Sequence, residues 1–475
     1  MGALPDARLA GDREIHRRGE DHGRTDLRAR CGVFDWNGEV MTTREGLRLG
    51  LFLVPTGHHL AAWAVAGSRS GSGLDIGHLE SMARTAERGR FDLLFLADVV
   101  GLFNVDPEGL QRDANALLFE PFTLLSRLSA VTGHIGLVAS ASTSYNSPFA
   151  LARMLSSLDH LSGGRAGWNI VTSYQPALAK AFGYADQLSH DQRYGKAAEF
   201  VDVARQLWRS WGEKAVVADK STRTYLDLAE LHPTQHEGAY YSVTGALSIG
   251  PSPQGEPLLV QAGSSAQGRD FAARFAEVMF GVAPTLQQAQ EFKVDIARRA
   301  AGHGRAPSSY VYLPGAFVLV GESTDAAFAK LDELNAHVDP VDGVSMLHNF
   351  GIAFDPEVHS LDDPFWMLPA TSGQEGRRAA LANLAREQDL SVRDVCRRIA
   401  VSRGHAMFVG SPEDIADGFE RWYREQAVDG FNVMCARLPE DLDLFVEHVL
   451  PLLRARGLFP AGYGDDTLRG SMGLS

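Results

Sequence analysis

The chain has 475 residues, of which 45% are hydrophobic and 9% aromatic, and its formal net charge is −14; this is the composition of a globular protein with a large core. The anionic balance without a basic patch excludes nucleic-acid binding and disfavours anionic membrane surfaces, and no apolar run reaches the roughly 18 residues of a membrane-spanning helix. The three cysteines lack metal-ligand spacing and indicate a reducing, cytoplasmic location.

The first segment, residues 1–44, contains eight arginines and eight acidic residues without apolar periodicity. Such a composition cannot bury enough surface to offset the entropy of ordering. We therefore predict a disordered extension, or a start placed upstream of the natural one, with Met41 as the alternative start. The globular pattern begins at Leu47, and residues 45–475 are predicted to form a single domain.

From Leu47 onward, short apolar runs alternate with segments of helical spacing. The predicted strands are 47–54, 91–97, 135–141, 165–173, 258–262, 277–282, 310–321 and 430–436. Predicted helices cover 75–89, 120–131, 147–161, 192–211, a segment from about 266, segments after the sixth and seventh strands, 411–428 and 439–456. This alternation implies a parallel sheet, and eight units predict a closed (β/α)8 TIM barrel. A doubly wound open sheet is the alternative.

Two long insertions, at about 213–255 and 339–403, interrupt the alternation. The second carries Phe350, Phe354, Phe365 and Trp366 in an irregular context. Long connections in compact domains are functional or disordered, and barrel active sites lie at the carboxyl ends of the strands. The aromatic residues favour an ordered lid over that end of the barrel.

The fifth predicted strand ends in Gln261-Ala-Gly-Ser-Ser265, and a helix follows from about Ala266. First-turn amides of a helix have no internal partner and carry partial positive charge. Gly263 allows close backbone approach, and Ser264 and Ser265 add donors, so the turn suits a phosphate. The alternative is an ordinary turn in which Ser264 or Ser265 caps the helix.

Polar side chains follow the other strands. They are His58, His59 and Trp63 after the first, Asp98, Phe103 and Asn104 after the second, Ser142 after the third, and Asn169, Ser173 and Tyr174 at the end of the fourth. Strand alternation places Asn169, Val171 and Ser173 on one face. For His58 a core or capping role is the alternative to catalysis, and for Tyr194 the alternative is packing.

The sequence contains no carboxylate pair, nucleophile triad or dinucleotide fingerprint. His232 and His236 have metal-compatible spacing, but they lie in a loop without a nearby third ligand, so no metal site is expected. Hydroxyl and amide groups beside a phosphate site, with few acid–base groups, indicate a cofactor that carries the chemistry.

Several longer motifs carry a family resemblance. The most specific is Leu158-Asp-His-Leu-Ser-Gly-Gly-Arg-Ala-Gly-Trp-Asn-Ile-Val-Thr-Ser173, and the runs 91–98, 120–125, 142–148, 253–255, 261–265, 429–432, 451–457 and 467–469 add to it. Together they resemble the bacterial-luciferase-like flavin monooxygenases, in the branch of the nitrilotriacetate, dibenzothiophene-sulfone and long-chain-alkane enzymes. The match spans about 47–474.

The resemblance implies a two-component monooxygenase. A separate NAD(P)H-dependent flavin reductase would supply reduced FMN, and a peroxyflavin formed with oxygen would oxygenate a small organic substrate. We also expect a homodimer or homotetramer. A deazaflavin-dependent dehydrogenase of the same superfamily and a non-catalytic flavin-binding barrel are the alternatives.

The resemblance also assigns roles by position. Gly263, Ser264, Ser265 and Tyr194 are implied to bind the FMN phosphate. Asp98, Ser142, Asn169 and Ser173 are implied to line the flavin pocket, and Trp63, Phe103 and Tyr174 the substrate pocket. His58 is implied to be catalytic, as a proton donor or hydrogen-bond partner at the reactive edge of the flavin. Phe103, Tyr174 and Ala64 depart from relatives, which argues against an alkane substrate and leaves the substrate open.

Overall fold

The computed structural model describes residues 45–69, 71–102, 107–371 and 374–474, and all of them lie in one compact unit, Thr43–Ser475. The predictions about residues 1–44, including the disordered extension, lie outside the described residues. None of the described helices is long and apolar enough to cross a membrane.

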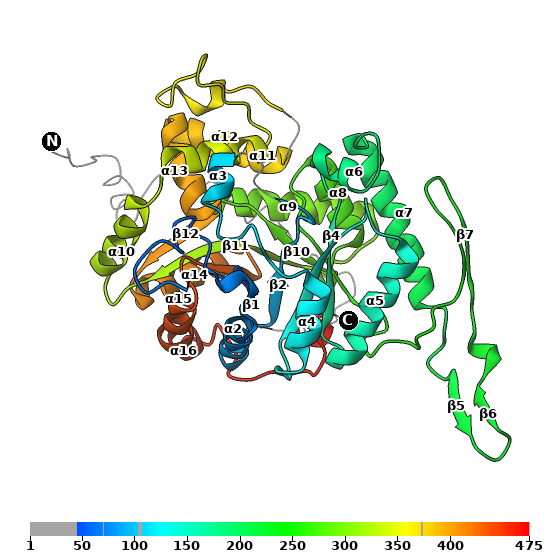
Figure 1. The fold of residues 1–475 in the computed structure, drawn as a ribbon. Coiled ribbons are helices and arrows are strands. Elements are labelled where there is room, and N and C mark those ends of the chain that lie inside the picture. Colours follow the sequence, from blue (N-terminus) through cyan, green and yellow to red (C-terminus); the bar gives the residue numbers. More distant parts are fainter. Residues whose placement is uncertain (1–44, 70, 103–106, 372–373, 475) are drawn as a thin grey trace, which may run out of the picture. The chain divides into compact units, whose positions relative to one another are not determined.

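The centre of the unit is a closed barrel of eight parallel strands, as predicted (Figure 1). Its strands are β1 (Arg48–Phe52), β2 (Leu93–Leu96), β3 (Gly136–Ser142), β4 (Ala166–Val171), β9 (Leu258–Gln261), β10 (Val278–Gly281), β11 (Val311–Val320) and β13 (Gly430–Cys435). Each pairs in parallel with the next, and β13 pairs with β1 to close the ring. The doubly wound alternative is therefore wrong.

Helices follow the strands and cover the barrel. They are α2 (Ile76–Arg88), α4 (Pro121–Ser129), α5 (Pro148–Ser162), α7 (His190–Trp208), α8 (Ala266–Phe275), α9 (Leu286–Gly302), α10 (Thr324–Ala336) and α14 (Pro412–Arg424), and the last predicted helix consists of α15 (Glu440–Leu444), one π-helical turn (Phe445–Val449) and α16 (Leu450–Ala455). Short helices occupy Ser72–Leu74, Pro107–Gln111 (α3), Pro176–Ala181 (α6), Pro307–Ser309 and Leu468–Ser471 (α17).

Local sequence explains where several helices begin. Ser411 accepts a hydrogen bond from the Asp414 amide and Asp414 bonds back to the Ser411 amide, which is a capping box with proline at the first helical position. Asp75 caps α2 and Glu120 caps α4 in the same way, by accepting from first-turn amides.

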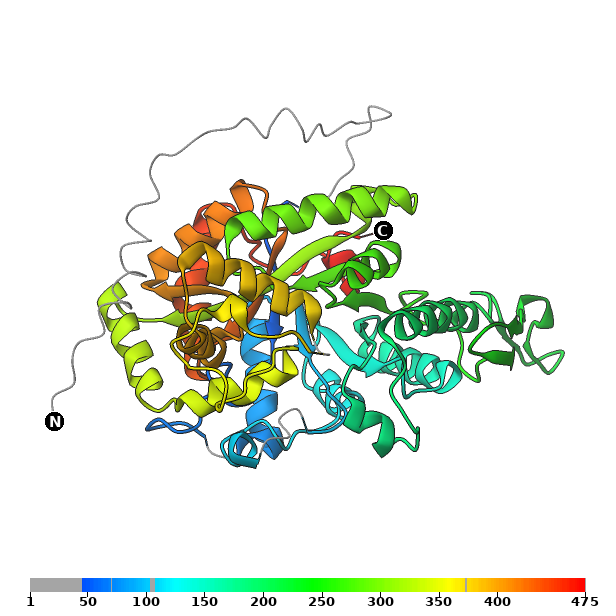
Figure 2. The same ribbon diagram turned by 90° about the horizontal axis from the view of Figure 1, so that it is seen from above.

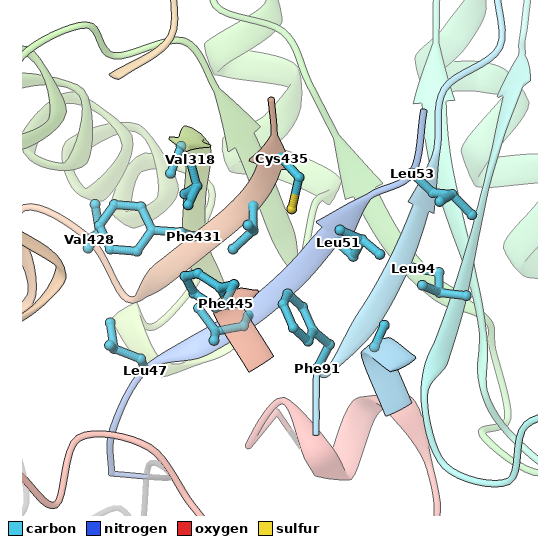
Figure 3. Packing of buried hydrophobic residues seen from close by; sticks show 14 of the residues in the cluster. Leu47, Leu51, Leu53, Phe91, Leu94, Val318, Val428, Phe431, Cys435 and Phe445 are labelled. Carbon is cyan, nitrogen blue, oxygen red and sulfur yellow. The ribbon is translucent and has the colours of Figure 1, made fainter. Parts of the chain in front are cut away.

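The main core lies between the outer face of the strands and the helices. Figure 3 shows Leu51 of β1, Leu94 of β2 and Phe431 of β13 packed with Phe91 and Phe445. These side chains are almost fully buried, so the hydrophobic term is concentrated in this layer. A second, smaller cluster fills the barrel interior around Leu93, Val138, Val260 and Leu313.

Two of the described cysteines are buried as free thiols in hydrophobic cores. Cys435 is on β13, and Cys396 is in the helical insertion described below. Burial raises the pKa of Cys396 to about 12 and that of Cys435 well above its ordinary value. Cys31 lies outside the described residues.

The first insertion forms an arm of two β-hairpins. One hairpin pairs β5 (Val216–Asp219) with β6 (Thr224–Leu226), and the other pairs β7 (Thr234–Glu237) with β8 (Ser242–Gly245), with a 3-10 turn at Leu228–Glu230 between them. Both views show the arm extending away from the barrel (Figures 1 and 2). These four strands were not predicted, because each has only three or four residues and shows little of the apolar alternation that marks a half-buried strand.

The second insertion is mostly helical, which corrects the irregular context predicted for it. It contains α11 (Pro340–Asn349), a 3-10 turn at Phe365–Met367, α12 (Glu375–Gln388) and α13 (Val392–Ser402), which lie together in Figure 1. The aromatic residues Phe350 and Phe365 are buried in its own small core, which orders the segment.

A ninth strand, β12 (Ala406–Gly410), follows this insertion and was also not predicted. It pairs with residues Ala316–Val320 of β11, whereas β10 pairs with Val311–Pro314. Since β11 has ten residues and β10 has four, the far half of β11 offers an edge that β12 occupies.

Candidate active site

A cavity of about 410 Å³ lies at the carboxyl ends of the barrel strands. Phe52, Asp98, Asn169, Gln261 and Phe280 reach it from successive strand ends, and residues of the second insertion complete the wall. Its volume falls within the range of small-molecule sites. This cavity lies at the end of the barrel where the site was predicted.

The turn between β9 and α8 forms one side of this cavity. The Ser265 hydroxyl accepts from the Gly268 amide at 3.1 Å and caps α8. A Cβ atom at Gly263 would lie 3.0 Å from the Gly268 Cα, and one at Gly268 would lie 2.8 Å from the Tyr194 hydroxyl. Two glycines thus let strand, helix and tyrosine meet closely. Ser265 therefore caps the helix, as the alternative interpretation of the turn predicted. Ser264 and Ser265 nevertheless both line the cavity.

Helix α7 supplies the groups that face this turn. The Tyr194 hydroxyl is hydrogen-bonded to the side chains of Ser265 and Thr172, and burial raises its pKa. His190 Nε2 lies 3.4 Å from Ser265 Oγ. Arg193, which sequence reasoning did not select, also lines the cavity, and its buried Nε has no hydrogen-bond partner among the described residues. Arg193 Nη1 donates to the Leu188 carbonyl at 2.8 Å, which leaves Nε for a ligand. A turn with a nearby cation and hydroxyl donors is a suitable anion site.

The fourth strand places only part of its predicted set in the wall. Asn169 lines the cavity; its Nδ2 donates to Ser140 Oγ at 2.7 Å, while its buried Oδ1 has no partner within the described residues. Ser173 does not line the cavity. The strand ends at Val171, and Ser173 has a φ of 24°, so its hydroxyl turns to Ser142 Oγ at 2.7 Å. The predicted alternation is wrong beyond Val171, and Ser142 and Ser173 form a pair behind the wall.

Three of the remaining predicted pocket residues line the cavity, and the fourth lies outside the described residues. Asp98 lines the cavity and accepts from the Val100 amide at 2.8 Å, and burial raises its pKa. Trp63 and Tyr174 also line it, and Tyr174 accepts from Gln374 Nε2 of the second insertion at 3.1 Å. Phe103 lies outside the described residues.

His58 is fully buried directly behind the wall. Its ring packs edge-on against Phe52 at 4.6 Å between centroids, and its Nε2 donates to the Phe52 carbonyl at 3.0 Å. Burial, reinforced by the nearby Arg403 charge, lowers the pKa of His58 to about 3. The imidazole is therefore neutral near pH 7, with its one proton held by a backbone oxygen. This geometry argues against the proton-donor version of the prediction and leaves Nδ1 as an acceptor.

His405, which the sequence analysis missed, lines the cavity together with His190 and His337. It precedes β12, and its ring stacks on Phe280 at 5.4 Å. Arg377 Nη2 lies 3.5 Å from its Nε2, and burial lowers its pKa well below the ordinary value. The sequence did not point to His405, because the strand that follows it, β12, was not predicted.

The second insertion contributes directly to the site. A Cβ at Gly376 of α12 would collide with the Ser264 side chain, so α12 packs closely on the β9–α8 turn. Met346 of α11, Arg377 of α12 and Arg403 after α13 line the same cavity. The placement is that of a lid, and the lid function stays a prediction.

No group of three potential metal ligands occurs within the described part of the chain. His236, one of the two histidines with metal-compatible spacing, lies on β7 of the arm and bonds Glu199 Oε1 at 3.1 Å. That contact holds the arm to α7, which is a structural role.

Comparison with known proteins identifies the class. The family model described as luciferase-like monooxygenase matches residues 55–430, and the chain belongs to this family. N-acetyl-S-(2-succino)cysteine monooxygenase of Bacillus subtilis (strain 168) is 41% identical over 438 residues, which cover 92% of this chain and 98% of that protein. Nitrilotriacetate monooxygenase component A of Aminobacter aminovorans is 38% identical over 443 residues, with the same coverage of 92% and 98%.

A crystal structure of riboflavin lyase with modified FMN and riboflavin superimposes with a TM-score of 0.80 at 30% sequence identity, over 90% of this chain and 95% of that one. The predicted family, barrel fold and monooxygenase activity are thereby confirmed: the protein is an oxidoreductase that oxygenates a small organic substrate.

Proposed function

We propose that the protein is the oxygenating component of a two-component system, in which a separate NAD(P)H-dependent flavin reductase supplies reduced FMN. The observation that carries this proposal is the turn between β9 and α8, where Gly263 and Gly268 meet beneath Tyr194. The name of the nitrilotriacetate enzyme as component A supports a separate reductase, and the modified FMN of the riboflavin lyase supports the cofactor.

The residues present fit an FMN phosphate. Ser264, Ser265 and Tyr194 provide hydroxyl donors, and Arg193 provides a cation whose buried Nε lacks a partner among the described residues. The unpartnered Oδ1 of Asn169 would accept a hydrogen bond from an N–H group of the flavin ring system. When bound, reduced FMN supplies the electrons that activate oxygen.

The protein's own residues then exclude water and orient the reactants. Phe52, Phe95 and Phe280 form an aromatic cluster in the wall, with ring centroids 5.0 to 5.7 Å apart. Helix α12 packs on the β9–α8 turn through Gly376 and Ser264 and covers that part of the cavity. A dry site strengthens polar contacts and prevents side reactions with water. Ser142 and Ser173 support the flavin pocket from behind, and neutral His58 acts by position and hydrogen bonding.

We also propose a homodimer or homotetramer in the cytoplasm, where the reductase finds NAD(P)H. The arm supports the oligomer, because isolated two-stranded hairpins are marginally stable in water and Val216, Tyr225 and Leu228 on it are each more than half exposed. Sedimentation of the full chain and of a variant with 216–245 replaced by a short Gly/Ser link tests this, and a monomer in both cases contradicts it.

The function is tested by titrating FMN, reduced FMN and a deazaflavin into the protein, and by following oxygen uptake with a general flavin reductase. We expect tight binding of reduced FMN, weak binding of the deazaflavin, and substrate-dependent incorporation of one oxygen atom by mass spectrometry. Preference for the deazaflavin would favour the dehydrogenase alternative, and flavin binding without turnover on any substrate would favour the non-catalytic barrel.

A further inference from the structure

Two arginines of the second insertion bring positive charge to the cavity without a direct ion pair among the described residues. Arg377 is on α12, and Arg403 follows α13 with a φ of 53°. Both line the cavity, and the Nε atom of each is buried without a hydrogen-bond partner. Among the described residues, no carboxylate forms an ion pair with either. By contrast Arg112, the arginine at the cavity rim, pairs with Asp339 and Asp342.

The guanidinium of Arg377 is surrounded by an aromatic ring and a neutral histidine, so an anionic ligand could pair with it. Its guanidinium lies 4.7 Å from the centroid of the Phe350 ring and 3.5 Å from neutral His405 Nε2. Burial lowers its pKa to about 10, so it stays charged at neutral pH. The positive charge of Arg403 also lowers the pKa of Arg377, whereas the negative charge of Asp113 favours the protonated form of Arg403. A buried cation without a partner is costly unless a ligand supplies the opposite charge.

The proposed phosphate turn between β9 and α8 has Arg193 as its cation, so Arg377 and Arg403 are available for another ligand. Arg193 comes from α7, next to Tyr194 and the Ser265 hydroxyl. Arg377 instead contacts His405, whose ring stacks on Phe280 of β10. The planar guanidinium matches a carboxylate with two parallel hydrogen bonds.

We propose that the substrate is an organic carboxylate whose carboxylate group is bound by Arg377 and Arg403, with its apolar part against Phe280 and Met346. This rests on the proposed function and deepens it by naming the substrate class. Loss of either arginine removes charge-assisted hydrogen bonds and leaves the other guanidinium facing the same site.

The test measures binding with matched pairs of probes. Hexanoate, benzoate, succinate and glutarate are compared with their methyl esters, and inorganic phosphate serves as a different anion, by calorimetry on FMN-free and FMN-loaded protein. We expect the carboxylates to bind at least about 10-fold more tightly than the esters. Arg377→Gln and Arg403→Gln should each weaken the carboxylates by roughly 10- to 100-fold and leave the esters unchanged.

Three controls keep the outcomes separate. Arg386→Gln removes an equal charge from the exposed side of α12 and should change nothing, and Arg377→Lys should retain the preference for carboxylate over ester if a Gln variant folds poorly. FMN affinity should stay within about 2-fold in Arg377→Gln, since each lost charged hydrogen bond would cost more than that. Equal binding of acid and ester, or no saturable binding of any acid, overturns the proposal.

A weakened FMN affinity in Arg377→Gln with intact carboxylate binding assigns that guanidinium to the flavin phosphate and also overturns the proposal. Failure of the unmodified protein to bind FMN, with carboxylates still bound by the FMN-free protein, would defeat the proposed function alone.

Discussion

Gly268→Ala tests whether the glycine pair beneath Tyr194 is the flavin phosphate site. The added Cβ would lie 2.8 Å from the Tyr194 hydroxyl and 3.1 Å from the Gly263 backbone, whereas ordinary contact begins at 3.4 Å. The hydroxyl must therefore move by about 0.6 Å, which is 3.4 minus 2.8 Å. Because Gly263 is itself packed on Gln261, the tyrosine side chain is the part that yields.

Two opposing terms set the effect on folding. Alanine in a helix interior is favoured over glycine by about 1 kcal/mol, and overpacking costs about 1–3 kcal/mol. The free energy of unfolding should thus fall by about 0–2 kcal/mol. Displacing one hydroxyl donor from a charged phosphate removes about 1.5–3 kcal/mol of binding, which is a 10- to 150-fold rise in the Kd for FMN.

The assay is an FMN titration by fluorescence together with thermal unfolding of the flavin-free protein. Gly302→Ala is the matched control, because it is also a helical glycine and a Cβ there meets nothing within 4 Å; it should keep FMN affinity and leave the midpoint equal or higher. An FMN Kd for Gly268→Ala within 3-fold of the unmodified protein would refute the assignment of this turn to the phosphate.

Three further predictions concern other groups. Replacing Ser264 and Ser265 together by alanine should weaken FMN by about 1.5–3 kcal/mol per lost donor while backbone amides retain part of the affinity, as a titration would show; unchanged affinity contradicts the site. His58→Phe should slow oxygenation about 10- to 100-fold with little change in FMN Kd, and the parent rate should show no titration from His58 between pH 5 and 8, because its pKa is about 3; full activity in this variant and its loss in His405→Phe would move the role to His405. Burial raises the pKa of Asp441 from 3.8 to about 7, so its contribution to stability is present at low pH and is lost as pH rises toward and through 7, at up to about 1.4 kcal/mol per pH unit; urea unfolding of Asp441→Asn should lack this component, and parallel pH curves would contradict the buried acid.

The barrel could be predicted because its strands are short apolar runs that alternate with segments of helical spacing. Such runs are marked by local residue type, and helix starts such as Ser411-Pro412 are marked by capping chemistry. The arm and β12 could not be predicted in the same way. β12 exists because β11 is long enough to leave an edge beyond β10, which is a property of the tertiary arrangement.

Some of the residues that carry the family resemblance stabilise the barrel and do not line the cavity. Asp159 Oδ1 accepts from the Ala166 amide at 3.0 Å, and Gln254 Oε1 accepts from the Arg469 amide at 2.9 Å. Arg165 is buried and donates to four backbone carbonyls and to Thr132 Oγ1. These contacts tie the amino-terminal end of β4 to the chain's last helix, where barrel residues serve stability.

The site residues missed by sequence share a different property. Arg193, Arg377 and Arg403 look like ordinary helical surface charges, and only their missing partners in the folded chain set them apart. The predicted direction of the Ser173 side chain was wrong because of the backbone: the positive φ of Ser173 ends the alternation of side chains that a regular strand would have.

The burial of the two free thiols has a consequence for the lifetime of the enzyme. The proposed reaction of reduced flavin with oxygen releases hydrogen peroxide whenever substrate is missing, and peroxide oxidises thiolates rather than thiols. Cys396 and Cys435 are kept protonated and out of reach by the cores that contain them. Among the described residues, oxidation should therefore begin at the exposed thioethers of Met154 and Met367, which lie outside those cores and whose oxidation is reversible.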